Sequence, residues 1–66
     1  MSVFVVLKHK DSSGDPVEIE VIDASEAVIT SGFLNVYSVD HCDNKVINRN
    51  LLGSFFISEI IGYYIA

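Results

Sequence analysis

Apolar and acidic side chains largely alternate over residues 17–23, VEIEVID. This two-residue period is typical of a β-strand with one face in the core and the other in water. Residues 2–10, SVFVVLKHK, are rich in β-branched and aromatic side chains, and the turn-forming segment DSSGDP at 11–16 separates the two runs. The first third of the chain therefore predicts a β-hairpin.

Opposite charges indicate a register for this hairpin. If Lys10 faces Glu18 and Lys8 faces Glu20, ion pairs form on one face, while Leu7 meets Val21 on the other. The predicted core face then consists of Val3, Val5, Leu7, Val17, Ile19 and Val21. The opposite face turns apolar toward the N-terminus, where a patch in need of a cover forms from Phe4, Val6 and Ile22.

The middle of the chain predicts a crossing segment and a second hairpin. Residues 23–32 begin with possible helix caps, but β-branched residues favour an extended crossing segment that ends in a turn at 30–32. Residues 33–39, FLNVYSV, predict a strand. DHCDN at 40–44 predicts a turn, and KVINR at 45–49 predicts the return strand.

The C-terminal segment, LLGSFFISEIIGYYIA, is compatible with two structures. Ser54, Ser58 and Gly62 recur every four residues, which would give a helix a narrow polar stripe, and Asn50 could cap that helix. Two glycines and many isoleucine, phenylalanine and tyrosine residues favour strands instead. We predict a strand that ends at residue 57, a turn over 58–60 and a last strand over 62–65.

Together these elements predict an all-β fold in a single small domain that spans residues 1–66. The expected architecture is a small antiparallel five-stranded, partly open barrel of SH3-like design, which limits exposed strand edges. The alternative is an α+β fold, a curled antiparallel sheet with one C-terminal helix on its face. Both architectures host many unrelated activities, so function has to be argued from particular residues.

Composition indicates association with other protein. Half of the residues are hydrophobic, yet a chain of 66 residues buries only about 60% of the surface that it exposes when unfolded. A single cysteine excludes a disulfide within the chain. We therefore expect a homodimer or a higher oligomer, with the following interface candidates: Phe4, Val6, Ile22, Tyr63 and Tyr64.

Charge and hydropathy also bear on location and on partners. A net charge of −5 repels phosphate backbones, which makes nucleic acid an unfavourable ligand and a basic protein a suitable one. The N-terminal apolar run ends at Lys8 and is shorter than the apolar core of a secretory signal. The C-terminal apolar run is too short to span a bilayer. We expect a cytoplasmic protein without membrane contact.

No residue cluster carries a catalytic or cofactor-binding signature. Asp40, His41, Cys42 and Asp43 are adjacent, whereas zinc ligands are spaced in pairs, and adjacent residues of an extended chain point to opposite faces. Glu18 and Glu20 have Lys8 and Lys10 as expected ion-pair partners, and no glycine opens a phosphate-binding motif. We expect no enzyme activity, no metal and no cofactor.

Two functions remain as hypotheses. The first is a non-enzymatic, small acidic protein-binding or regulatory module that acts as an oligomer. The alternative is a small barrel that binds single-stranded nucleic acid by stacking bases on exposed aromatic side chains beside cations. The residues that could serve this alternative are Phe33, Tyr37, Lys45 and Arg49.

Overall fold

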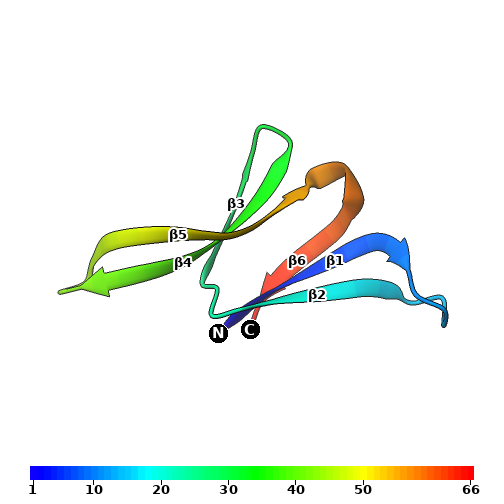
Figure 1. Cartoon of the computed structure of the whole chain (residues 1–66), viewed down its shortest axis with the longest axis horizontal. Coiled ribbons are helices and arrows are strands. Elements are labelled where there is room, and N and C mark those ends of the chain that lie inside the picture. Colours follow the sequence, from blue (N-terminus) through cyan, green and yellow to red (C-terminus); the bar gives the residue numbers. More distant parts are fainter.

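Six β-strands form two antiparallel sheets in the structure, a computed structural model that describes residues 1–66 (Figure 1). Sheet A has the strand order β2-β1-β6, and sheet B has the order β3-β4-β5. The fold is therefore all-β, as predicted, and the two open sheets are compatible with a small, partly open barrel. The elements are β1 (Ser2–Lys10), β2 (Pro16–Ile22), β3 (Glu26–Thr30), β4 (Phe33–Cys42), β5 (Lys45–Phe56), the 3₁₀ turn η1 (Ile57–Glu59) and β6 (Ile60–Ile65).

The strand count is six instead of the predicted five. Glu26–Thr30, expected as a crossing segment, pairs along its whole length with β4, because its β-branched residues favour the extended backbone. The alternative with a C-terminal helix is wrong. β5 runs to Phe56, η1 supplies one short turn, and β6 then pairs antiparallel with β1.

The second hairpin turns more tightly than predicted. β4 continues through Cys42, and only Asp43 and Asn44 connect it to β5. Their φ angles of 52° and 64° match a type I′ turn, whose twist suits an antiparallel hairpin, and Asp and Asn tolerate this left-handed backbone. The ribbon that they close extends well beyond the rest of sheet B (Figure 1).

The predicted register of the first hairpin is wrong by two residues next to the loop and by four residues beyond the β1 bulge. Glu20 lies across from Phe4 and not from Lys8, and Lys10 lies across from Pro16. The Asp11 carboxylate accepts hydrogen bonds from the backbone N–H groups of Ser13 and Asp15, which closes the loop early, and a bulge in β1 adds a further shift.

An even shift leaves every side chain on its predicted face, because side chains alternate with a period of two. Val3 and Val5 are fully buried, and Leu7 and Val21 pack against the core, which confirms these four members of the predicted core face. Val17 and Ile19 are half-buried and do not reach the core cluster. The expected ion pairs of Lys8 and Lys10 are absent, and the one ion pair of the structure joins Arg49 to Glu26 at 3.1 Å.

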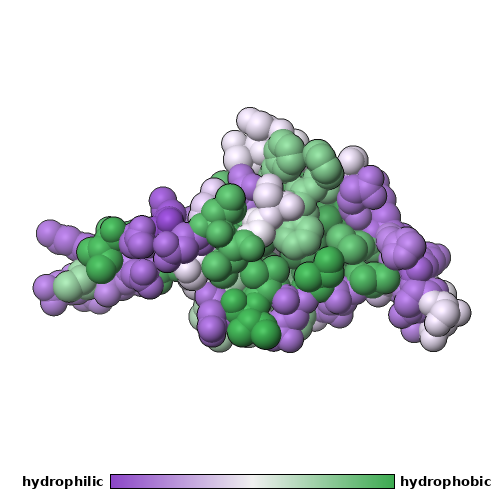
Figure 2. Space-filling view, in the orientation of Figure 1, coloured by the Kyte–Doolittle hydropathy of each residue, from purple (hydrophilic) through white to green (hydrophobic).

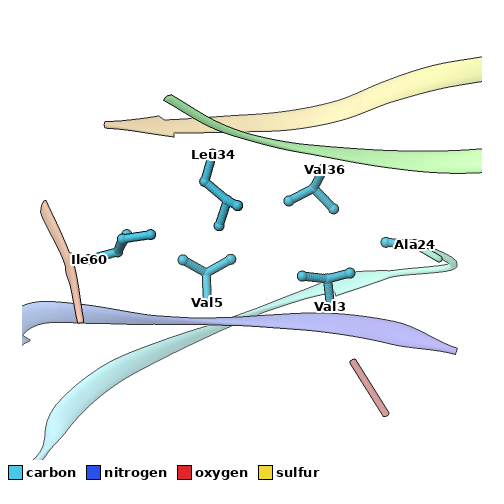
Figure 3. Packing of buried hydrophobic residues seen from close by; sticks show 6 residues of the cluster. All are labelled: Val3, Val5, Ala24, Leu34, Val36 and Ile60. Carbon is cyan, nitrogen blue, oxygen red and sulfur yellow. The ribbon is translucent and has the colours of Figure 1, made fainter. Parts of the chain in front are cut away.

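The core is a layer of six side chains between the two sheets (Figure 3). Its lower side comes from sheet A and its upper side from β4, while a loop alanine closes one end. Only seven of the 66 residues are buried, so few contacts hold the sheets together. The six core residues are Val3, Val5, Ala24, Leu34, Val36 and Ile60.

We predict that Leu34→Ala destabilises the protein by about 2–5 kcal/mol, because it leaves a cavity in this thin core. A domain of this size has a total stability of only about 3–5 kcal/mol, so the variant will be largely unfolded at 25 °C. Urea denaturation followed by circular dichroism measures this loss. Leu51→Ala is the matched control, because Leu51 is 59% exposed and its truncation changes stability by about 0.5 kcal/mol or less.

Candidate protein-binding surfaces

The outer face of sheet A, which points away from the core, combines aromatic and acidic side chains. Phe4 in β1 lies between Glu20 in β2 and Tyr64 in β6. One step along the strands, Val6 lies between Glu18 and Gly62. The sheet therefore places two carboxylates along one side of a central apolar row. We call this surface the acidic face; its residues are Phe4, Val6, Glu18, Glu20, Ile22, Gly62 and Tyr64.

A stacked aromatic pair organises the acidic face. The rings of Phe4 and Tyr64 lie 4.9 Å apart between centroids and are nearly parallel, at 10°. The Tyr64 hydroxyl reaches across Val6 and donates a hydrogen bond to the Glu18 carboxylate, and the Ser2 hydroxyl donates to Glu20 at 2.8 Å. The two carboxylates are thus held in place beside the rings.

The hydrogen bond to Glu18 raises the pKa of Tyr64 above its usual value of 10.0, and the negative charges of Glu18 and Glu20 add to this effect. A phenolate would lose the bond and would face both carboxylates. Tyr64 therefore remains a protonated donor at neutral pH.

The interface candidates from the sequence occupy two different places. Phe4, Val6, Ile22 and Tyr64 share the acidic face, where Phe4, stacked on Tyr64, and Val6 are half-buried while Ile22 remains 67% exposed. Tyr63 lies across from Val5, so it points to the opposite side of sheet A. There it lies at the outer edge of β6, and it remains exposed.

The outer face of sheet B is a second exposed surface, and it is more apolar. Phe33 and Phe56 lie across from each other with ring centroids 5.0 Å apart, and Tyr37 lies across from Leu51. Phe56 was not singled out from the sequence. Strand alternation could have predicted an exposed phenylalanine here, because Phe55 and Phe56 are adjacent and only one of them can face the core. Figure 2 shows apolar side chains gathered over the middle of the molecule, between the polar ends of the two hairpins.

The residues of the nucleic-acid alternative do not form one basic surface. Phe33, Tyr37 and Arg49 share the outer face of sheet B, but Arg49 is already paired with Glu26. Arg49 lies across from Val39, and Lys45 lies across from Cys42, three positions further along β4. Because side chains alternate along a strand, Lys45 projects from the opposite side of the ribbon.

The polar cluster near the second turn is divided between two faces. His41 lies across from Val46, and Cys42, the next residue, lies across from Lys45 on the other side of the ribbon. The exposed Cys42 thiol has the neighbouring Asp43 carboxylate at 4.0 Å. No group of three or more His, Cys, Asp or Glu side chains is arranged to hold a metal ion, and the surface has no pocket.

No protein-family model matches this chain, and no curated protein or solved structure is significantly similar to it. The structure contains no helix with the length and hydrophobicity needed to span a membrane.

We predict that Glu18→Gln lowers the pKa of Tyr64 toward 10.0, because it removes the charge while an acceptor oxygen remains. In the wild-type protein, the raised pKa means that the hydrogen bond from Tyr64 to Glu18 stabilises the fold below about pH 10. This stabilisation is lost as the pH rises through the folded-state pKa of Tyr64. An NMR titration of the Tyr64 ring measures both proteins. Glu20→Gln is the control; a larger fall of the pKa in this variant than in Glu18→Gln would contradict the assignment.

Proposed function

We propose that this protein is a non-enzymatic protein-binding module that acts as an oligomer and binds a basic, partly apolar segment of another protein on its acidic face. The observation that carries this proposal is the position of Glu18 and Glu20 beside the Phe4 and Tyr64 rings. No lysine or arginine of the chain pairs with these carboxylates, since the one ion pair joins Arg49 to Glu26.

Arginine is the side chain that best suits such a surface. Its planar guanidinium stacks on aromatic rings and donates several hydrogen bonds to carboxylates. Glu18 and Glu20 each accept one hydroxyl hydrogen bond and have further acceptor capacity. Ile22 and Val6 add apolar contacts beside this charge, so a partner segment with both basic and aliphatic side chains would match the acidic face.

Exposed apolar surface supports the oligomeric part of the proposal. Large apolar side chains remain uncovered on the outer face of sheet B and along β6. The nucleic-acid alternative has weaker support, because Arg49 is paired and Lys45 lies on another side. The proposal places the module in the cytoplasm, where the exposed thiol of Cys42 stays reduced.

A short peptide that alternates arginine and leucine tests the binding function. We expect the wild-type protein to bind it at low salt and the double variant Glu18→Gln, Glu20→Gln to bind it on the order of 10-fold more weakly, because two partly exposed ion pairs are lost. Isothermal titration calorimetry measures both affinities. A peptide of alternating glutamate and leucine should not bind.

The double variant Asp43→Asn, Glu59→Gln is the matched control, because it removes the same amount of charge at exposed positions outside the acidic face. It should retain wild-type affinity. Equal losses in the two double variants would show that only net charge matters, and an absence of peptide binding by the wild-type protein would contradict the proposal.

A further inference from the structure

β6 forms an edge of sheet A that contains one register shift but neither charge nor proline, two of the features that protect an edge against pairing with another strand. Natural sheets protect their edges with charges, proline, bulges or short strands. The other three edges have such features: β2 contains Pro16, Glu18 and Glu20, β3 has five residues, and β5 contains Lys45, Arg49 and two register shifts. From Ile60 to Ala66 the chain has no charged residue and no proline.

The backbone of β6 has unpaired hydrogen-bonding groups on its outer side. Ser2 and Ala66 exchange two backbone hydrogen bonds, at 2.8 and 3.0 Å. In an antiparallel ladder such pairs recur every two residues, so Tyr64 also directs its N–H and C=O groups toward β1. The N–H and C=O groups of Tyr63 and Ile65 therefore point away from the sheet.

The side chains at this edge are apolar and accessible. Tyr63 and Ile65 share the core side of sheet A with Val5 and Val3, yet they are 39% and 45% exposed because sheet B does not cover them. Ile61, the extra residue at the β6 register shift, is 63% exposed. The edge thus offers both backbone groups and apolar side chains to a further strand.

We propose that β6 pairs antiparallel with β6 of a second copy, about a two-fold axis at Tyr63. The product is one continuous six-stranded sheet with the order β2-β1-β6-β6-β1-β2. This inference deepens the oligomeric part of the proposed function and rests on it. A second copy suits this edge because each chain has a net charge of −5, so two copies can approach closely only where charge is absent.

Residues whose numbers add to 126 lie across from one another in this register. Tyr63 then meets its own counterpart, which joins its outward-pointing N–H and C=O groups to those of the second copy, and Ile65 lies across from Ile61 of the second copy. On the acidic face, Tyr64 lies across from Gly62 of the second copy.

Gly62 supports this register. Its φ angle is not positive, and an added Cβ would meet no atom within 4 Å, so the single chain has no steric need for glycine here. Glycine within a strand often marks the close approach of another chain. Because the Tyr64 ring is turned toward Phe4 and Glu18 of its own chain, the space beside Gly62 is left open to the second copy.

Because the axis is perpendicular to the sheet, both acidic faces lie on the same side of the dimer. Phe4 and Tyr64 of each copy flank the junction, so a single partner could contact both faces. The paired assembly would therefore bind a partner with two basic segments more tightly than either copy alone.

Light scattering and hydrogen exchange test the β6 pairing in the intact protein. From about 10 μM to about 1 mM, where small interfaces associate, we expect a mass approaching twice 7.3 kDa. The amides of Tyr63 and Ile65 should exchange slowly at the high end of this range and rapidly at the low end. Tyr63→Lys should yield a folded monomer, because it places two like charges at the axis and its amide makes no bond to β1.

Ile47→Lys is the matched control, since Ile47 is 65% exposed at the far end of the second hairpin and the change in net charge is identical. It should remain a dimer. A wild-type monomer throughout the range would overturn both the oligomeric proposal and the β6 pairing. An oligomer that persists in Tyr63→Lys, with unprotected amides at Tyr63 and Ile65, would overturn the β6 pairing alone. Arginine peptide binding is measured separately and does not depend on either result.

Discussion

The contact between two small sheets is the constraint on which this structure depends. A three-stranded sheet of this size requires a covered apolar face to be stable. Val3 and Val5 of β1 meet Leu34 and Val36 of β4 across the interface, and Ala24 and Ile60 close its ends (Figure 3). Each sheet has only one face for this contact. The opposite faces and the strand edges therefore remain exposed, and they hold most of the apolar surface that the small core does not enclose.

The two outer faces differ in chemistry although both centre on a cross-strand aromatic pair. On sheet A, the Phe4 and Tyr64 stack lies beside two glutamates that receive hydroxyl hydrogen bonds, and no cation of the chain neutralises them. On sheet B, the Phe33 and Phe56 pair lies at the other end of the outer face from Arg49 and Glu26, whose charges are paired with each other. Only the acidic face presents unbalanced charge next to aromatic rings, which is why we assign partner binding to it.

Among the four edge strands, β6 differs from the others in how its edge is protected against pairing. β2 and β5 contain charged residues, and β3 is short, so additional strands are disfavoured at these edges. β6 has no charged residue, and an uncharged, apolar edge strand favours pairing with another strand. Symmetric pairing about Tyr63 would join the β6 edges of the two copies to each other, so the dimer would have no exposed β6 edge. Binding on the acidic face and association through β6 would then be separate properties of the same sheet.

The sequence by itself determined the all-β class, the two hairpins and the core face of β1 and β2, because a period of two and local turn residues are properties of short segments. Tertiary structure decided the pairings. The Asp11 loop and the β1 bulge moved Glu20 from Lys8 to Phe4, which converted expected ion-pair partners into unpaired carboxylates beside an aromatic ring. Likewise, the register shift between Asp40 and His41 put Lys45 and Arg49 on opposite sides of the ribbon, whereas a regular strand would have kept them on one side. Register depends on where a loop closes and where a bulge inserts a residue, and composition and periodicity contain little information about either.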